Sequence, residues 1–449
     1  MGIKIALIGA GSRSFGTGTV QDIFLSDPIC EKGIDLVLMD KVADNLAYIQ
    51  KRTQYVMKKL GRKAKLKTTT DLDVALADAD FAVAAIEVNR YLYWSQDFHV
   101  PRKYGFRQIY GENGGVGGIF HALRNMGPMV HIAKTMEKLC PNAILLNYTN
   151  PEHKLCEAIS RLTSIEVYGL CHGVFMGKWQ ISQILNIPME QLETTACGIN
   201  HFTWFQKIRD RRTGEDLYPR LRKIEGKADW LTQWHELALG RVLFRRFGLW
   251  PSPATNHYGE YIRWAEEFMA DELQYFYDPM EGHPWQTGKI PEFVYTADAA
   301  NTSRPWIAPT EQEKISGEEE APITPSGELA VPIMEGVACG LREELAAVNA
   351  PNKGKIPNLP DDMVVELPAI ADSGKVQTCQ MEPLPEAIAA MLHLQGSIHK
   401  LIVEAYAEKS KDKLLQAILL DPTVDSYRPA VDMMEEMLSL QEDLLPELT

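Results

Sequence analysis

The sequence predicts an α/β protein with an N-terminal doubly wound parallel sheet and a C-terminal domain of mixed α/β (α+β) structure. Over the first two hundred residues, short β-branched runs alternate with longer segments whose apolar residues recur at helical spacing, which is typical of βαβ units. A glycine-rich segment follows the first run directly and leads into a helix, as it does in Rossmann-like folds. Beyond residue 199 the segments become longer and more aromatic. We therefore expect two domains, over residues 1–198 and 199–449.

Each predicted element rests on a local pattern. Short β-branched runs bounded by turn residues predict strands, at residues 3–8, 34–39, 81–85, 143–147 and 165–168. Helical spacing of apolar residues predicts helices between these strands, at residues 42–59 and 120–139. In the second half the same criteria predict a strand over 363–368 and helices over 230–247, 386–407 and 426–440. The segment 279–325 is rich in Pro, Gly and Glu and is expected to be irregular.

Composition excludes several classes of protein. The chain has 449 residues, of which 45% are hydrophobic and 24% charged, as in a soluble globular protein of two or three structural units. The formal net charge of -14 argues against a nucleic-acid partner, because phosphate binding needs clustered Lys and Arg. Seven scattered cysteines do not form a disulfide framework. We see no signal segment and no run of about 20 apolar residues for a membrane span, so we expect a cytoplasmic protein without membrane contact.

The glycine-rich segment predicts a dinucleotide site. Gly9 and Gly11 permit a tight turn after the first strand, and with Ser12 they bring backbone amides to the positive end of the next helix, where a pyrophosphate binds. Asp40 ends the second strand, where its carboxylate can accept hydrogen bonds from a ribose 2′-hydroxyl. This acidic residue favours NAD over NADP, although its distance from the glycines exceeds the usual ~20 residues. The alternative is a glycine turn without a ligand. We expect the first domain to bind NAD.

Two residues in the middle of the chain are candidate metal ligands. Cys171 follows a predicted strand, and His201 lies in an Asn-His-Phe-Thr-Trp segment. A thiolate and an imidazole both suit a borderline divalent ion. Taken singly, each is more often a structural residue than a ligand. Two protein ligands would leave coordination positions open, as in a catalytic rather than a structural metal site.

Two further residues are candidate substrate contacts. Asn150 lies at the carboxyl end of a predicted strand, the edge of an open α/β sheet that faces the ligand crevice. It is equally compatible with an Asn-Pro turn that starts a helix. Glu112 is the one carboxylate in the glycine-rich stretch 111–118, which is expected to be a flexible loop.

The chain resembles a known enzyme family in an ordered set of motifs. They occupy residues 9–16, 112–118, 122–124, 150–151, 171–172, 200–201, 351–354, 358–360 and 365–368. On these motifs the chain is similar, over nearly its full length, to the family 4 glycoside hydrolases, which are NAD- and metal-dependent glycosidases. The resemblance implies that Cys171 and His201 bind the metal, with Mn²⁺ as the expected ion.

The resemblance implies a mechanism unlike that of glycosidases with paired carboxylates. NAD takes a hydride from C3 of the sugar, and the resulting ketone acidifies the C2 proton. The metal chelates the oxygens on C2 and C3 and stabilises the enolate. Loss of the C2 proton expels the glycosidic oxygen, water adds, and the hydride returns, so that NAD is a recycled cofactor.

Individual roles follow from the matching positions. Asn150 matches a residue that contacts sugar hydroxyls. His172 follows the metal cysteine, where the family places a leaving-group acid in some members, and an imidazole can serve near pH 7. For the base at C2 the resemblance points to the segment 255–261, in which we choose Tyr258. His257 and Tyr261 are rivals, and His257 otherwise contacts the substrate.

The expected substrate is an α-galacturonide. The motif Cys-His-Gly-Val at 171–174 resembles members that act on hexuronic acids and differs from the motifs of the phosphoglycosidases. Trp94 stands three residues before Asp97, where phosphoglycosidases carry an arginine, so a phosphate ligand is missing. Arg90 and Arg263 are candidates for binding a uronate carboxylate.

Several alternatives remain at this point. Within the family they are an α-glucuronidase, an α-glucosidase or an α-galactosidase. From other classes they are a simple NAD-dependent dehydrogenase of a sugar acid, which would release NADH, and a non-catalytic NAD-sensing protein. The family likeness also implies a homodimer or homotetramer, assembled through the second domain.

Overall fold

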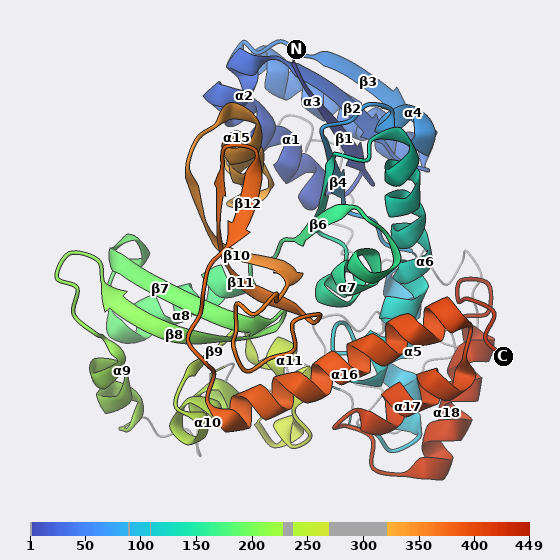
Figure 1. Ribbon diagram of the computed structural model, residues 1–449, viewed down its shortest axis with the longest axis vertical. Coiled ribbons are helices and arrows are strands. Elements are labelled where there is room, and N and C mark those ends of the chain that lie inside the picture. Colours follow the sequence, from blue (N-terminus) through green and yellow to red (C-terminus); the bar gives the residue numbers. More distant parts are fainter. Residues whose placement is uncertain (1, 89, 108, 228–236, 269–320) are drawn as a thin grey trace.

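The computed structural model describes residues 2–88, 90–107, 109–227, 237–268 and 321–449, and within them a single mixed β-sheet forms the centre of the molecule (Figure 1). Six parallel strands come first in the order β3-β2-β1-β4-β5-β6, which is the order of a Rossmann fold. They are β1 (Ile3–Ile8), β2 (Ile34–Met39), β3 (Lys65–Thr69), β4 (Phe81–Ala84), β5 (Ile144–Asn147) and β6 (Glu166–Gly169). The predicted fold class is confirmed.

Alternate residues of the central strands pack on opposite faces of the sheet. In β1, Ile5 and Leu7 belong to a cluster with Val20 and Ile49, whereas Ala6 and Ile8 belong to a different cluster with helices from the other side. Because both faces are covered, the strands are almost entirely apolar. This pattern made all but one of the parallel strands predictable to within one residue. The exception is the edge strand β3, whose two lysines are exposed and whose other residues are half-buried.

Eight helices of the first half connect these strands. They are α1 (Phe15–Leu25), α2 (Asp27–Lys32), α3 (Ala43–Leu60), α4 (Leu72–Leu76), α5 (Arg90–Lys103), α6 (Gly115–Leu139), α7 (Glu152–Leu162) and α8 (Gly173–Leu185). One prediction needs correction, because the glycine-rich stretch is only partly a loop. Gly115 to Gly118 form the buried first turn of α6, and a Cβ on Gly117 would lie 2.6 Å from the Asp97 carbonyl oxygen. The glycines therefore serve close packing rather than flexibility.

The second half extends the same sheet with antiparallel strands. They are β7 (Leu192–Ile199), β8 (Phe202–Asp210), β9 (Trp250–Ser252), β10 (Glu343–Pro351), β11 (Val364–Asp372) and β12 (Lys375–Thr378). β10 pairs with β6 at Asn349 and Gly169, which makes the sheet continuous. Helices α9 (Tyr218–Glu225), α10 (Ala238–Phe247), α11 (Thr255–Tyr258) and α15 (Ala330–Cys339) pack around these strands. Of the predicted helix 230–247 only the part from 237 lies within the described residues, and most of the segment 279–325 lies outside them.

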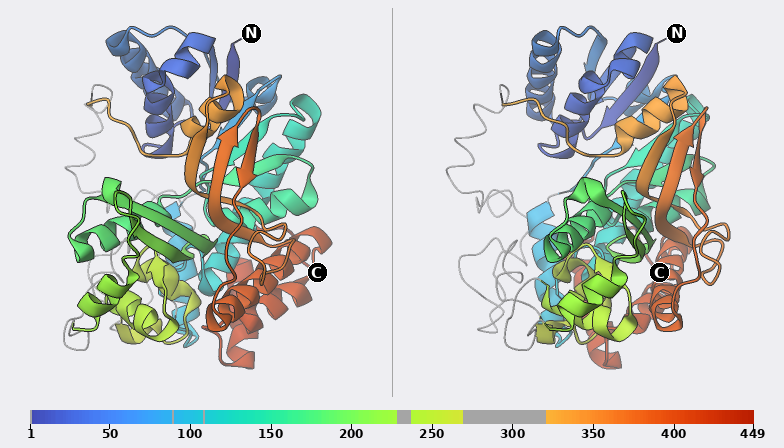
Figure 2. Two further views of the ribbon diagram at one scale, coloured as in Figure 1. Left: turned by 60° about the vertical axis from the view of Figure 1, so that its left-hand side comes forward. Right: turned by 90° about the vertical axis from the view of Figure 1, so that its left-hand side faces the viewer.

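The C-terminal helices return to the first half of the chain. They are α16 (Glu386–Glu408), α17 (Lys411–Leu420) and α18 (Tyr427–Leu440), and they lie together below the parallel sheet in Figure 1 and beside the antiparallel strands in Figure 2. Leu145 of β5, Ile402 of α16 and Met433 of α18 share one core cluster. The hydrophobic core therefore depends on both ends of the chain. None of the described helices is long and apolar enough to cross a membrane.

A buried ion pair joins the C-terminal end of the chain to the first half. Arg124 of α6 and Asp97 of α5 pair at 2.8 Å, and both side chains are only 1% exposed. Gln441, which follows α18, donates to the Asp97 carboxylate at 2.9 Å and accepts from Arg124 at 2.8 Å. The buried pair and Gln441 thus form one hydrogen-bonded network.

Replacing Asp97 by asparagine is expected to lower the free energy of unfolding by about 3–5 kcal/mol, because the Arg124 charge would stay buried without its partner. The free energy is measured by urea unfolding followed by tryptophan fluorescence. The control is Glu435→Gln in the exposed pair with Lys411, where a loss of at most about 1 kcal/mol is expected. Similar losses in both variants would contradict a special role for the buried pair.

Candidate active site

The predicted site residues gather where the parallel strands end. Gly9 follows β1, Asp40 follows β2, Asn150 lies three residues after β5, and Cys171 lies two residues after β6. Since parallel strands end at the same edge of the sheet, these four positions lie along one edge, where ligands of such folds bind.

The glycine turn after β1 has no room for side chains. Gly9 has φ 73°, and a Cβ there would lie 2.3 Å from the Ala85 carbonyl oxygen. A Cβ on Gly11 would lie 2.3 Å from Cβ of Asn45. The Gly11 amide donates to the Asp40 carboxylate at 3.0 Å, and the Val42 amide donates to its other oxygen at 2.9 Å. Asp40 therefore lies beside the turn and also holds it in place through these two hydrogen bonds.

The first turn of α1 continues from this loop. The Ser12 hydroxyl accepts a hydrogen bond from the Phe15 amide at 3.2 Å, which satisfies one of the free donors at a helix start. The Phe15 ring stacks on Tyr148 at 4.9 Å between centroids. The loop is thus held against the residues that follow β5, next to Asn150.

Three buried or half-buried side chains form the one group of potential metal ligands found among the described residues. Ligand atoms of Glu112, His201 and His257 all lie within 4.8 Å of one another. Glu112 precedes α6, His201 lies between β7 and β8, and His257 belongs to α11. The cluster therefore combines residues from both halves of the chain.

His201 occupies an unusual backbone position. Asn200 and His201 are the two-residue turn between β7 and β8, in which Ile199 pairs with Phe202. His201 has φ 64°, a left-handed conformation that is uncommon outside glycine. Residues in such conformations occur preferentially at functional sites. The turn holds the His201 ring 4.3 Å from that of His257, measured between centroids.

The protonation states of the cluster suit a cation. Burial lowers the pKa of His201 well below its usual range and also lowers the pKa of His257, so both imidazoles are neutral near pH 7. Burial would raise the pKa of Glu112, but the adjacent Arg90 outweighs it and holds the pKa below its ordinary value. Neutral imidazole and ionised carboxylate are the forms that bind metals.

The amide of Asn113 links the cluster to the strand ends. Its Nδ2 lies 2.6 Å from Nδ1 of His201, and 3.4 Å from the side-chain oxygens of both Asn150 and Asn200. Its Oδ1 is buried and has no hydrogen-bond partner within the described part of the chain. A buried acceptor of this kind is normally satisfied, so Oδ1 is available to a bound group.

A second set of contacts connects the cluster to the glycine turn. Glu87 follows β4 two residues after Ala85, which touches Gly9. His121 of α6 bridges Glu87 at 2.9 Å and the Glu112 carbonyl at 2.8 Å. Burial raises the pKa of Glu87, but His121 and nearby arginines outweigh it and bring the pKa to about 2. The glycine turn and the cluster are therefore neighbours.

Cys171 lies outside this three-residue cluster but next to it. Its sulfur accepts from the Gly173 amide at 3.3 Å, and it also interacts with the side chain of Asn200, the residue before His201. Burial, and then the carboxyl groups of Glu152 and Glu366, raise the pKa of the thiol well above its usual value. Such acidic surroundings favour a positive ion, which would ionise the thiol on binding.

His172 lies at the border of the site and is half-exposed. Its Nδ1 is 2.8 Å from Oε1 of Glu328, and this hydrogen bond raises the pKa of the imidazole. A Cβ built on Gly327 would lie 3.9 Å from the other ring nitrogen of His172, Nε2. His172 is thus oriented by the segment before α15.

The three candidates for the base at C2 differ in position. The Tyr258 hydroxyl lies 3.2 Å from Oγ1 of Thr255 and packs against Gly240 of α10. The Tyr261 hydroxyl donates to the Asn200 carbonyl at 3.2 Å. His257 is itself a member of the metal-ligand cluster.

The two candidate arginines lie in different surroundings. Arg90 is 30% exposed, forms an ion pair with Glu112 and a second with Glu87 at 3.3 Å, and lies over the Trp94 ring. Arg263 is 65% exposed and pairs with Asp425 at the surface. Of the two, only Arg90 contacts the cluster.

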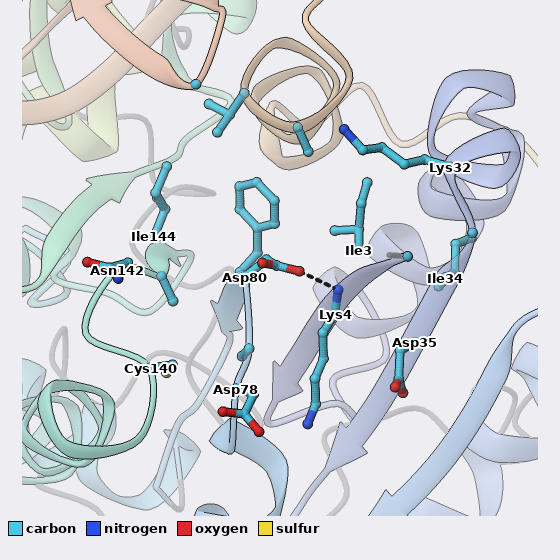
Figure 3. A pocket seen from close by; sticks show the side chains of 18 of the residues that line it. Ile3, Lys4, Lys32, Ile34, Asp35, Asp78, Asp80, Cys140, Asn142 and Ile144 are labelled. Carbon is cyan, nitrogen blue, oxygen red and sulfur yellow. Dashed lines mark hydrogen bonds between the residues drawn. The ribbon is translucent and has the colours of Figure 1, made fainter.

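A large groove lies at the opposite edge of the sheet. It has a volume of about 1060 Å³ and is lined at the starts of the parallel strands, among others by Lys4, Lys32 and Asp80 (Figure 3). Its position at the amino ends of the strands separates it from the cluster. Size alone therefore does not identify the active site here.

The sequence did not reveal several residues of the site. Glu87 was detectable, since it lies two residues after a predicted strand. Asn113, His121 and Glu260 carry no local signal, because their roles depend on partners that are distant in the sequence. Glu260 accepts hydrogen bonds from the amides of Glu112, at 2.6 Å, and of Asn113.

Solved structures share this fold. A 6-phospho-α-glucosidase from gut microorganisms, solved with NAD and Mn²⁺, is 23% identical with a TM-score of 0.78, and the match covers 100% of both chains. The 6-phospho-β-glucosidase of Thermotoga maritima, solved with manganese, NAD⁺ and glucose-6-phosphate, is 22% identical with a TM-score of 0.76 over 99% of both chains. Malate dehydrogenase from Plasmodium falciparum is more distant, at 12% identity and a TM-score of 0.51 over 93% of this chain and 99% of its own.

Sequence comparison identifies the family. An α-glucosidase of Erwinia rhapontici is 30% identical, and the match covers 99% of both chains. An α-galacturonidase of Thermoanaerobacter italicus is 28% identical, over 99% of this chain and 97% of the relative. Residues 4–187 match the family 4 glycosyl hydrolases, and residues 196–424 match the C-terminal domain of the same family. The chain therefore belongs to family 4 of the glycosyl hydrolases and is an enzyme that hydrolyses O-glycosyl bonds.

Proposed function

We propose that this glycosidase uses NAD and a divalent ion, Mn²⁺ or a similar metal, to cleave α-galacturonides. The observation that carries the proposal is the contact between the two predicted ligand sites. Gly9 touches Ala85, and two residues further Glu87 connects through His121 to Glu112 of the cluster. A nucleotide at the glycine turn and an ion at the cluster would therefore reach the same sugar.

The residues present fit both groups. Gly9, Gly11 and Ser12 would form the phosphate-binding turn of the proposed NAD site, and Asp40 would accept hydrogen bonds from the ribose. Cys171 and His201 are the proposed metal ligands, beside Glu112 and His257. When bound, NAD supplies a reversible hydride acceptor and the ion supplies a Lewis acid for sugar oxygens. The chain itself must orient the sugar and transfer protons.

We assign sugar binding and proton transfer to the side chains around the cluster. Asn150 and Asn113 present amide groups to sugar hydroxyls beside the cluster. His172, whose pKa is raised by its hydrogen bond with Glu328, is the proposed proton donor to the leaving oxygen at the exposed border. Tyr258 is the base that the sequence favours at C2. We assign this step to His257 instead, because its neutral imidazole adjoins His201 while the Tyr258 hydroxyl faces α10.

The preference for a uronide rests on the Cys-His-Gly-Val motif and on Arg90. Arg90 is the candidate cation that contacts the cluster, and its planar guanidinium suits a carboxylate. Curated relatives of this chain include an α-glucosidase, an α-galactosidase and α-galacturonidases at 27–30% identity. Glucuronides, glucosides and galactosides are therefore the alternatives.

We also propose an organisation for the whole chain. Residues 1–198 form the NAD-binding part, and residues 199–449 contribute substrate binding and assembly into a homodimer or homotetramer. A cytoplasmic location is supported by the seven cysteines, all of which are free thiols.

The proposal is tested with a panel of p-nitrophenyl α- and β-glycosides that includes galacturonides, glucuronides, neutral hexosides and 6-phosphates. With NAD and Mn²⁺, the α-galacturonide is expected to be cleaved fastest, without lasting absorbance from NADH. EDTA is expected to abolish cleavage and Mn²⁺ to restore it. Cleavage of the 6-phosphates alone would refute the substrate, and NADH formed in proportion to substrate would indicate a dehydrogenase.

Two measurements on the same variants distinguish a metal ligand from the base at C2. They are the affinity for Mn²⁺ and the exchange of the C2 proton with solvent. Cys171→Ser is expected to weaken Mn²⁺ binding at least tenfold, as measured by calorimetry, because the thiolate ligand is lost, while NAD binding stays unchanged. His257→Asn is expected to stop deuterium incorporation at C2 in D₂O, because the base is lost.

Two controls accompany these variants. Cys379→Ser changes a half-buried thiol that directly follows β12 and is expected to leave both measurements unchanged. Tyr258→Phe is expected to retain C2 exchange. Loss of exchange in Tyr258→Phe alone would return the role of base to Tyr258, and normal Mn²⁺ binding by Cys171→Ser would exclude that ligand.

Arg90→Gln tests the recognition of the carboxylate. A hydrogen bond to a charged group contributes about 1.5–3 kcal/mol, so kcat/KM for the α-galacturonide is expected to fall roughly 10- to 100-fold more than kcat/KM for the α-galactoside. Arg263→Gln is the matched control and is expected to change neither value. Equal losses on both sugars would show that Arg90 supports Glu112 rather than the substrate.

A further inference from the structure

We infer that the exposed face of α8 binds the leaving-group side of the substrate, and that this side is itself a carbohydrate. The face consists of Met176 and Trp179, on the helix that begins immediately after His172. The inference rests on the proposed function, in which His172 faces the leaving oxygen. It adds a binding surface beyond the scissile bond.

The exposure of these two side chains is not explained by the fold. Trp179 is 52% exposed and Met176 is 40% exposed. The opposite face of α8 is firmly packed, with Ile181 and Leu185 in a core cluster. A Cβ on Gly177 would lie 2.5 Å from the Ser252 hydroxyl. The helix is therefore fixed in place without its exposed apolar side chains.

The exposed residues start at the site and lead away from it. Met176 and Trp179 follow His172 by four and seven residues, so all three lie on one helical face. At 1.5 Å per residue, Trp179 stands ~10 Å from His172 along the axis. The His172 side chain is 47% exposed, so the border of the site is accessible to solvent at the start of this helix. The distance suits more than one sugar unit and exceeds the reach of a small phenol.

The chemistry of the face favours a sugar. An indole ring combines a flat apolar face with a polar edge, and a pyranose ring presents a flat array of C–H groups that stacks on it. Exposed apolar patches beside a polar site commonly mark ligand binding. A substrate whose leaving group is an oligosaccharide would extend along α8, whereas an aryl glycoside would not reach Trp179.

The test compares Trp179→Ala with the unchanged enzyme on two substrates. For an α-linked galacturonate trisaccharide, KM is expected to rise at least tenfold with little change in kcat. For p-nitrophenyl α-galacturonide, both constants are expected to change less than twofold. Trp179→Phe retains an aromatic face and is expected to restore most of the affinity. Tyr427→Ala, which removes an aromatic ring that is 63% exposed on α18, is the matched control and is expected to have no effect.

Further measurements separate the inference from its rivals. Equal losses on both substrates, or no loss on the trisaccharide, would overturn the inference. A change in subunit number of Trp179→Ala by light scattering would also overturn it, because the face would then be a subunit interface. Binding of the trisaccharide to these variants can also be measured by calorimetry, because that measurement does not depend on turnover. A panel in which no α-galacturonide is cleaved would refute the proposed function itself, whatever the Trp179 variants show.

Discussion

The site depends on the hydrogen bonds that the carboxyl group of Glu260 accepts. This group accepts hydrogen bonds from the amides of Glu112 and Asn113, residues that are nearly 150 positions earlier in the chain. The same loop carries Glu112 into the cluster and presents Asn113 to His201. Glu260 thereby joins this loop to the segment that carries His257, where the Tyr110 ring also packs 5.3 Å from the ring of His257. The cluster therefore exists only when the two halves of the chain are joined.

The site buries several ionisable side chains close together. Lys154 is buried and donates to the Asn113 carbonyl, and burial lowers its pKa to about 8. Burial likewise raises the pKa of Glu260 to about 8. Burying such groups costs free energy that partner charges only partly offset. His201 adds a left-handed backbone conformation. Such free-energy costs are expected to gather at one site where function, rather than folding, determines the choice of residues.

The sequence was most informative where a residue's environment follows from its neighbours in the chain. Strands such as Ile3–Ile8 were predictable because burial on both faces makes them almost entirely apolar. Gly9, Asp40, Asn150 and Cys171 were placed correctly at one sheet edge by the rule that parallel strands end together. Their chemical roles remain predictions.

Features that depend on tertiary contacts could not be read in the same way. The hairpin of β7 and β8 escaped notice because its turn is Asn-His rather than a glycine turn, and tertiary contacts hold His201 in the left-handed conformation. Residues 115–118 looked like a loop because the close neighbour of Gly117, the Asp97 carbonyl, comes from a different helix. Glu260 was invisible for the same reason.

The positions of the site residues explain why the family is easier to identify from the sequence than the substrate. The glycine turn, the cluster and the contacts between them occupy the centre of the site and involve the reaction shared by the family. The residues that we propose to distinguish sugars, His172 and Arg90, lie at its border and are partly exposed. Relatives with different sugars are almost equally similar to this chain, at 30% for an α-glucosidase and 28% for an α-galacturonidase. Overall identity averages over the whole sheet, whereas the choice of sugar depends on a few border side chains. Those side chains, rather than the degree of similarity, must decide the substrate.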